Sequence, residues 1–144
     1  MAVLRENPYG EFNFLVDLGT GDTEGPEAGF QEVSGLGQEV EVIEYRNGND
    51  KVNAVRKLPG LTKVPDVTLK RGVIGSLALY QWLRDASSRT VRVHLQNEDR
   101  SAIVMSWTLV RARPVKHVAG PLDAKGSDVA MEELTLAYER LEIE

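Results

Sequence analysis

Few residues in this sequence have the types and spacing that catalysis would need. The two histidines, His94 and His117, stand 23 residues apart without a Glu-x-x-His pattern, so a structural or surface role is expected for each. The chain has no cysteine, which excludes a thiolate nucleophile, a disulfide and any zinc site built on cysteine. No phosphate-binding loop, dinucleotide fingerprint or Gly-x-Ser-x-Gly elbow occurs. We therefore predict no catalytic residue, no cofactor and no metal, and we do not expect an enzyme.

Glu39 and Glu41 are the one pair of carboxylates whose spacing could serve acid–base chemistry. They alternate with Val40 and Val42, so a strand would place both acids on one face. General acid catalysis would require one carboxyl to be desolvated so that its pKa rises. Nothing nearby in the sequence would bury either group. A solvated acidic strand face is therefore the preferred interpretation.

Length and composition indicate a single folded domain covering residues 1–144. Apolar residues make up 42% of the chain and charged residues 27%, which allows a hydrophobic core. The net charge of −5 argues against a dedicated nucleic-acid binder. No apolar run reaches the roughly 18 residues of a membrane span, and the N-terminus lacks the apolar region of a signal peptide. We expect a protein that is made in the cytoplasm and has no membrane anchor.

Most of the chain alternates apolar and polar residues with period two, which indicates β-strands. Expected strands cover residues 12–18, 30–34, 39–46, 66–71, 90–96, 102–110 and 129–141, with a loop at 19–29. The phase of the third strand slips at Ile43, which suggests a β-bulge. One helix should follow Ser76 and bury a stripe formed by Leu79, Trp82, Leu83 and Ala86. The predicted fold is mainly β: a small β-barrel or sandwich of two packed antiparallel sheets with one flanking α-helix.

Residues 44–58 are predicted to form a long projecting hairpin. Asn and Gly at 47–50 favour a tight turn, and the following residues offer no face that must be buried. Pro59 and Gly60 are expected to close the hairpin. Ordering an element that packs on nothing is entropically costly, so a partner should dock on it. The candidate contact residues are Tyr45, Arg46, Asn47, Gly48, Asn49, Asp50, Lys51, Arg56 and Lys57.

Seven short motifs, taken together and in order, resemble the tail tube proteins of contractile phage tails. They are NFLV at 13–16, FQEVSGL at 30–36, IEYRNG at 43–48, KLPG at 57–60, VTLKRG at 67–72, WTLVRARP at 107–114 and AMEEL at 130–134. The resemblance extends from about Pro8 to the C-terminus. It is closest to the inner tube proteins of phage-like extracellular contractile injection systems, which are related to type VI secretion tubes.

This resemblance implies a structural protein whose hexameric rings stack into a hollow tube. The implied partners are other copies of the chain, a contractile sheath protein, baseplate or spike proteins and a tube terminator. Effector cargo or DNA would pass through the lumen without sequence-specific binding. Neighbouring subunits would join their sheets and leave no exposed strand edge, and the hairpin would reach another subunit or ring. Glu39 and Glu41 become candidates for the lumen face.

Two alternatives remain open at this point. The chain could form a tube initiator or adaptor ring at the baseplate or the tube end, because paralogues with these roles share the family pattern. It could also be an unrelated soluble β-sandwich that binds a small ligand in an apolar pocket. The resemblance does not distinguish a phage tail from a headless injection system.

Overall fold

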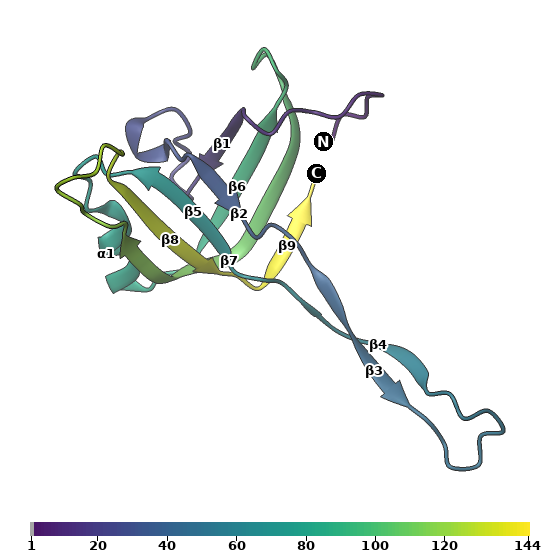
Figure 1. Cartoon of the computed structure of the whole chain (residues 1–144). Coiled ribbons are helices and arrows are strands. Elements are labelled where there is room, and N and C mark those ends of the chain that lie inside the picture. Colours follow the sequence, from purple (N-terminus) through teal and green to yellow (C-terminus); the bar gives the residue numbers. More distant parts are fainter. Residues whose placement is uncertain (1) are drawn as a thin grey trace.

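The computed structural model describes residues 2–144, and β-strands are its main regular structure (Figure 1). The strands are β1 (Phe14–Asp17), β2 (Glu32–Ser34), β3 (Glu39–Tyr45), β4 (Arg56–Lys63), β5 (Val67–Gly72), β6 (Arg89–Gln96), β7 (Ile103–Ala119), β8 (Met131–Ala137) and β9 (Arg140–Ile143). The helix α1 (Ala78–Asp85) and the short 3-10 helix η1 (Pro26–Ala28) accompany them. Seven strands form a body from which the β3–β4 hairpin projects. The mainly β class, the flanking helix and the projecting hairpin are thus confirmed.

The alternating sequence of β5 and β8 explains how the body acquires a core. Val67 and Leu69 on β5 are buried, and they face the same side as Leu134 and Leu136 on the antiparallel partner β8. Side chains of successive strand residues point to opposite faces, so one face of each strand contributes to the core while the other meets solvent. The same pattern places Val91, Val93 and Leu109 of β6 and β7 in this core.

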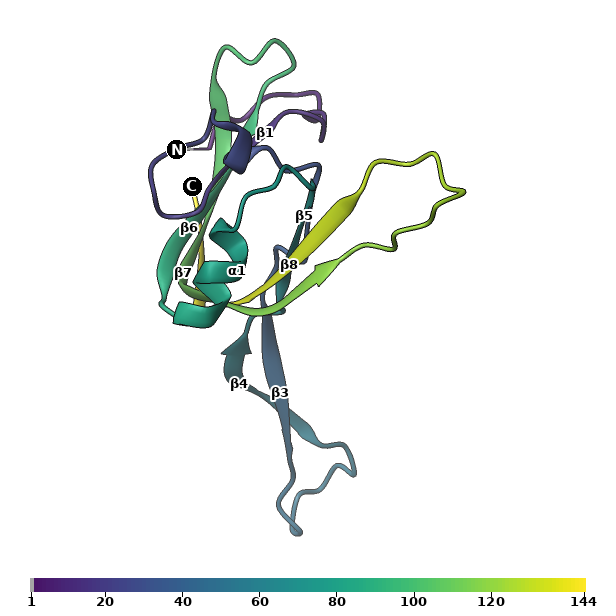
Figure 2. The same cartoon turned by 90° about the vertical axis from the view of Figure 1, so that its left-hand side faces the viewer.

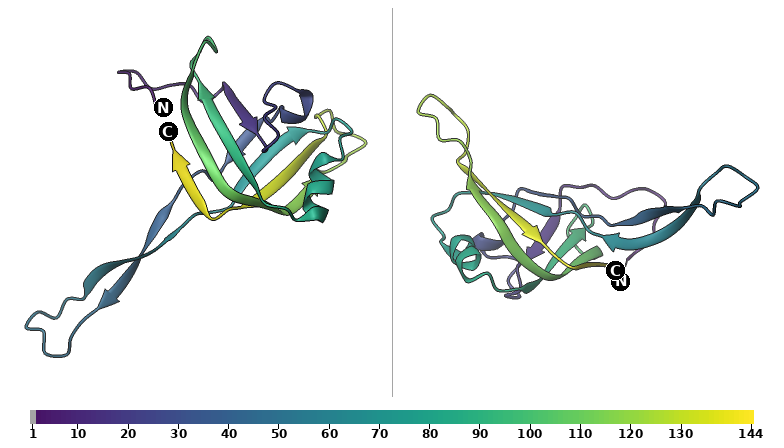
Figure 3. Two further views of the ribbon diagram at one scale, coloured as in Figure 1. Left: turned by 180° about the vertical axis from the view of Figure 1, so that it is seen from behind. Right: turned by 90° about the horizontal axis from the view of Figure 1, so that it is seen from below.

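Strand β7 belongs to both antiparallel sheets of the body. Its first part pairs with β6 and β9, and its second part, from Arg113 onward, pairs with β8. Between the two parts, Arg111 adopts the left-handed conformation with φ 56°, next to a register shift against β6. A bulge of this kind bends a strand and increases its twist. The bend directs one continuous strand from the first sheet into the second (Figure 3).

The prediction of a single strand over residues 129–141 was wrong. This segment forms two strands, β8 and β9, separated at Tyr138 and Glu139. β8 pairs with the second part of β7 and β9 pairs with the first part, so the segment must follow the bend of its neighbour. The Glu139 amide donates a hydrogen bond to the Val110 carbonyl at 3.0 Å and fixes this crossover.

The predicted helix is confirmed, and it packs beside β7 at one side of the body (Figure 2). Leu79 and Trp82 are buried as expected, and the Trp82 indole donates to the Ser87 carbonyl at 2.8 Å. The Ser76 hydroxyl accepts a bond from the Ala78 amide at 3.2 Å at the start of the helix. Ala86 is exposed rather than part of the buried stripe, because it adopts φ 53° and ends the helix.

The N-terminal segment is attached to the body by contacts that the sequence pattern did not indicate. The Val3 amide donates to the carbonyl of Val104 on β7 at 2.8 Å. Arg5 forms a two-pronged ion pair with Glu98 in the β6–β7 turn and stacks over the Tyr9 ring at 3.8 Å. This pairing lowers the pKa of Glu98 to about 2 and raises the pKa of Arg5. Polar contacts thus hold the segment against the edge of the body.

Candidate assembly surfaces

The predicted hairpin is present, and it is longer than expected. β3 and β4 pair from Glu39 opposite Lys63 to Tyr45 opposite Arg56, and the connecting loop covers residues 46–55. The expectation that Pro59 and Gly60 close the hairpin was wrong, since β4 continues through both residues. Proline is tolerated here because β4 has a free edge. A Cβ on Gly60 would lie 3.0 Å from the Glu41 carbonyl, which explains the glycine at this position.

The bulge expected at Ile43 was wrong, because the irregularity of the hairpin lies before Ile43 and its extra residue belongs to β4. The register shifts between Val40 and Val42, where one residue of β3, Glu41, stands opposite two residues of β4, Gly60 and Leu61. Beyond the shift, Val42 lies opposite Pro59 and Ile43 lies opposite Leu58. Because consecutive residues point to opposite faces, the stem of the ribbon carries apolar side chains on both faces.

The stem exposes more apolar surface than a free surface element normally would. Every residue of β3 is exposed, including Val42 at 56% and Ile43 at 50%, and Leu61 on β4 is 73% exposed. A two-stranded ribbon by itself is marginally stable in water. Both of its outer edges also carry unpaired backbone donors and acceptors within the described residues, which favours pairing with another chain. The hairpin therefore has the properties of an interaction element.

The tip of the hairpin is organised around Asp50. Its carboxylate accepts bonds from the Asn47 amide and from Arg56, both at 3.0 Å. Arg46 donates to the Asp50 carbonyl at 3.1 Å and to Asn53 at 3.0 Å, and the Tyr45 hydroxyl bonds the Asn47 side chain. The structure thus brings five of the nine predicted contact residues into one network. A tip that is ordered before it binds loses less conformational entropy on docking.

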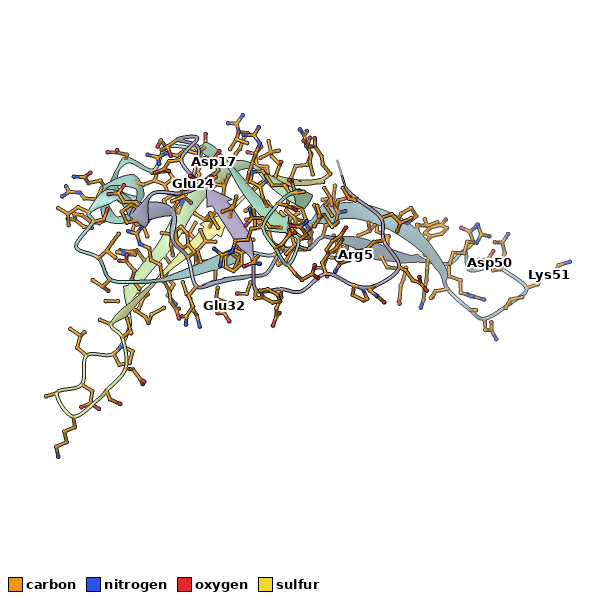
Figure 4. All side chains as sticks on the ribbon, turned by 90° about the horizontal axis from the view of Figure 1, so that it is seen from above. Arg5, Asp17, Glu24, Glu32, Asp50 and Lys51 are labelled. Atoms are coloured by element: carbon orange, nitrogen blue, oxygen red, sulfur yellow. The ribbon has the colours of Figure 1, made fainter. Side chains whose placement is uncertain are left out.

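The other four predicted contact residues remain outside this network. Gly48, Asn49 and Lys51 are exposed at the apex of the loop, and Lys57 is exposed on β4 opposite Glu44. Lys51 marks the far end of the molecule in Figure 4. These side chains are therefore free to contact another molecule.

Glu39 and Glu41 lie on the stem of the hairpin, and both are exposed. Glu39 is opposite Lys63, and the Lys63 ammonium is 3.6 Å from the Glu41 carboxylate. Neither carboxylate is buried, so neither has the desolvated setting that general acid catalysis requires. Their surroundings therefore match the preferred interpretation of a solvated acidic face.

Charge is strongly segregated along the chain. Residues 6–45 contain ten acidic residues and no lysine or arginine, whereas residues 46–125 contain fifteen lysines and arginines and six acids. In space, Asp17 and Glu24 lie on the body and Lys51 lies at the opposite end of the long axis (Figure 4). The hairpin alone, residues 39–63, carries four acids and five lysines and arginines, so this segregation along the sequence does not make the two ends of the subunit oppositely charged.

Sequence reasoning missed a buried ionic network. Arg71 on β5 is 1% exposed, and its Nε donates to the Glu132 carboxylate on β8 at 2.6 Å. Its Nη1 donates to the Glu27 carbonyl at 2.6 Å, and its buried Nη2 has no partner among residues 2–144. His117 is 3.1 Å from the other oxygen of Glu132. Burial raises the pKa of Glu132, but hydrogen bonds from Arg71 and His117 outweigh this and leave the pKa lowered.

The remaining histidine, His94, is half-buried on β6, and its Nδ1 lies 2.7 Å from the Ser106 hydroxyl. Burial lowers the pKa of this histidine. Within residues 2–144, no three acidic, histidine or cysteine side chains are grouped as a metal site. No helix in that range is long and apolar enough to cross a membrane.

Residues 10–142 match the family model described as T4-like virus tail tube protein gp19. The chain belongs to this tail tube family. The match covers the hairpin and the whole body, and it confirms the resemblance inferred from the seven motifs. The family consists of structural tube proteins rather than enzymes. Among curated protein sequences, none matches the chain.

Solved structures place the tail tube fold of this chain among contractile injection systems. A chain of the PVC sheath–tube complex, an extracellular contractile injection system in its extended state, is 28% identical with a TM-score of 0.83. That match covers 96% of this chain and 93% of the other. A chain of the anti-feeding prophage baseplate is 30% identical, with a TM-score of 0.80 and coverage of 96% and 97%.

Another solved structure shares the fold alone. Hcp1 from Flavobacterium johnsoniae is 13% identical to this chain, with a TM-score of 0.57. The match covers 90% of this chain and 93% of Hcp1. The expected Hcp-like fold class is therefore confirmed.

Proposed function

We propose that this tail tube protein forms hexameric rings that stack into the hollow inner tube of a contractile tail or injection system. The β3–β4 hairpin carries the proposal, because it exposes apolar side chains and open strand edges that only another molecule can cover. Membership of the tail tube family supports a second copy of the chain as that molecule.

The projecting geometry explains how one chain can build a tube. The hairpin extends far beyond the body, so it reaches a surface that its own body cannot offer (Figure 1). A contact between two different surfaces of the same chain is heterologous, and it generates a closed ring or an open filament. A tube needs both kinds of contact: closed contacts join the subunits within a ring, and open-ended contacts join one ring to the next.

Further partners follow from the same proposal. A contractile sheath protein would surround the tube, and its contraction would drive the tube forward with effector cargo or DNA in the lumen. Baseplate or spike proteins and a terminator would occupy the two ends. The match to a chain of a sheath–tube complex supports this arrangement.

Glu39 and Glu41 are proposed to line the lumen, where their negative charge would prevent acidic cargo from adhering. Both side chains are exposed in the subunit and are therefore available to such a surface. A structure of the assembled tube tests this directly. Burial of both carboxylates between subunits or against the sheath would refute it.

Negative-stain electron microscopy of the purified protein, alone and with its sheath protein, tests the main proposal. Stacked rings with a central hole are expected. A variant lacking residues 47–55 should stay folded, with an unchanged circular dichroism spectrum, but should form no tubes. Tubes of normal appearance from that variant would show that the hairpin is dispensable.

A second candidate function is a tube initiator or adaptor ring. The match to a chain of the anti-feeding prophage baseplate favours this alternative. An initiator should stop at a single ring, whereas a tube body should polymerise into long tubes by itself or on a nucleus. The length of the particles seen in the microscope therefore separates the two functions.

A further inference from the structure

Asn47 and Gly48 stand at the start of the turn in the hairpin tip, and they form the only Asn-Gly pair in the sequence. The Asp50 amide donates to the Asn47 carbonyl at 3.1 Å, which closes the turn. In such a pair the backbone nitrogen of the glycine can attack the side-chain amide carbon of the asparagine, because no Cβ on the glycine blocks the approach. The surroundings of both reacting groups favour this attack.

The Gly48 nitrogen, which would be the nucleophile, is accessible. Gly48 is exposed, and a Cβ built on it would meet no atom within 4 Å. Among residues 2–144, no group accepts a hydrogen bond from its amide. A bonded amide would have to break that bond before losing its proton, at a cost in free energy. The Gly48 amide can therefore be deprotonated without breaking a bond within the protein.

The side-chain amide of Asn47, which would be attacked, is polarised by a neighbour. The Tyr45 hydroxyl donates a hydrogen bond to its Oδ1. The backbone beside it is also held, because the Asn47 amide donates to the Asp50 carboxylate at 3.0 Å. A donor at a carbonyl oxygen stabilises the negative charge that develops there when a nucleophile adds to the carbon. Tyr45 therefore places a hydrogen bond where the attack creates charge.

We propose that Asn47 is a site of spontaneous deamidation. Hydroxide removes the proton of the Gly48 nitrogen, which then forms a bond to Cγ of Asn47. The bond between Cγ and Nδ2 breaks, and Nδ2 takes a proton from water and leaves as ammonia. One water molecule opens the resulting cyclic imide: cleavage at Cγ gives aspartate, and cleavage at the backbone carbonyl carbon gives isoaspartate. The sum consumes one water and releases one ammonia, with no oxidation or reduction.

Both products change the network at the hairpin tip. Each places a new carboxylate beside that of Asp50, and like charges this close disfavour each other. Isoaspartate also adds a methylene group to the main chain, and the carbonyl that accepts the bond from the Asp50 amide becomes part of a free carboxylate. The tip should therefore loosen as the protein ages. This inference goes beyond the proposed function and does not depend on it, because the reaction takes place within one chain.

Incubation of the purified chain in heavy-oxygen water tests the proposal, because each hydrolysed amide gains a labelled oxygen. Size exclusion would first remove any polymer, so that the tip is uncovered. Peptide mass spectrometry should find the label at Asn47, and an isoaspartate methyltransferase assay should detect the isomer. Asn53 is the matched internal control: it lies in the same loop, its Oδ1 accepts a bond from Arg46 at 3.0 Å, but Ala54 follows it. Asn53 should remain unlabelled when half of Asn47 has reacted.

Two variants test the roles of the neighbours. Gly48→Ala should slow the reaction to the rate of Asn53, and alanine fits there because the φ of Gly48 lies outside the left-handed region. Tyr45→Phe should slow the reaction about two- to tenfold, which corresponds to the loss of one hydrogen bond. Amide hydrogen exchange of residues 46–55 should be faster in the fully reacted chain.

The possible outcomes are distinct. Label that appears at Asn47 no faster than at Asn53, or an unchanged rate in Gly48→Ala, would overturn the proposal. An equal or higher rate in Tyr45→Phe would overturn the role of the hydroxyl, and unchanged amide exchange would overturn the loosening of the tip. A chain that deamidates as expected but forms no tubes would count against the proposed function alone.

Discussion

Replacing Glu132 with alanine should remove a large share of the stability of the subunit. Arg71 is buried, and its Nη2 already has no partner within the described chain. Without Glu132 its Nε also loses its acceptor, so only the bond to the Glu27 carbonyl remains. Removing one partner of a buried ion pair costs about 3–5 kcal/mol. This is a substantial fraction of the roughly 5–15 kcal/mol that stabilises a typical domain.

The reverse change should cost less. Arg71→Met leaves Glu132 buried, but His117 remains 3.1 Å from its carboxylate, so we expect a loss of about 2 kcal/mol. The double variant Arg71→Met/Glu132→Leu should lie within about 1 kcal/mol of the natural chain, because apolar residues of similar volume can replace a buried ion pair. The losses of unfolding free energy caused by the two single changes should therefore not add up in the double variant.

Urea and thermal unfolding, followed by the fluorescence of Trp82 and Trp107, would measure these effects. The measurements belong in the variant lacking residues 47–55, so that association does not contribute to the apparent stability. Glu132→Ala should lower the melting temperature by about 10 °C. A loss below about 1 kcal/mol for Glu132→Ala, or a double variant as unstable as the two single changes combined, would refute the reasoning.

The pH dependence gives an independent check on the same network. The folded pKa of Glu132 lies below its ordinary value of 4.5, so its contribution is present above that value and is lost as pH falls through the folded pKa. The double variant should lose this component of acid sensitivity. If the natural chain and the double variant unfold at the same acidic pH, Glu132 does not contribute to acid sensitivity and the prediction is wrong.

Three further predictions concern other parts of the chain. Arg5 lowers the pKa of Glu98 to about 2, so the contact between the two side chains should persist above pH 4.5 and be lost as pH falls toward 2. Amide hydrogen exchange of residues 2–12 should therefore become faster near pH 2, and in the variant Arg5→Ala it should already be faster at pH 7. Arg111→Gly should preserve or raise stability in urea unfolding, whereas Arg111→Val should cost about 1–2 kcal/mol, because its φ is 56°. Gly35→Ala should cost about 2 kcal/mol or more by the same assay, since φ is +93° and a Cβ would lie 2.3 Å from the Asp66 carbonyl oxygen.

Alternation of apolar residues allowed most strands to be predicted, because burial itself alternates along them. The break between β8 and β9 was missed, although the sequence contained a signal. Leu134, Leu136 and Tyr138 share one face, whereas Leu141 is also buried but stands at an odd spacing from Tyr138. Such a change of phase marks a strand that leaves one sheet for another.

The buried ionic network could also have been suspected from the spacing of charged and buried residues along two strands. Arg71 stands an even number of positions from Val67 and Leu69, and Glu132 stands two positions from Leu134. Both charged residues therefore had to point to the core face of their strands. What the pattern does not contain is the pairing of two strands 61 residues apart in sequence. Residue type and spacing alone therefore did not predict the network.

The hairpin was predictable because its turn is local, whereas the open side of the body between β1 and β2 was not. The Asn and Gly residues at 47–50 define the turn within four positions. This opening depends on β1 and β2 becoming the two ends of the strand order of the body, which is a property of the complete topology. Non-local strand order is the information that a single sequence expresses least directly.

The continuity of β7 has a mechanical consequence. Two packed sheets held only by side chains can slide past each other when opposite forces act on them. Here a single strand of 17 residues, extending over roughly 55 Å, is hydrogen-bonded into both sheets. A shearing force between the sheets therefore acts along a covalent backbone and on two ladders of hydrogen bonds, instead of on apolar contacts alone. The body should yield as one unit under load, which would suit the proposed role in a tube that is driven forward.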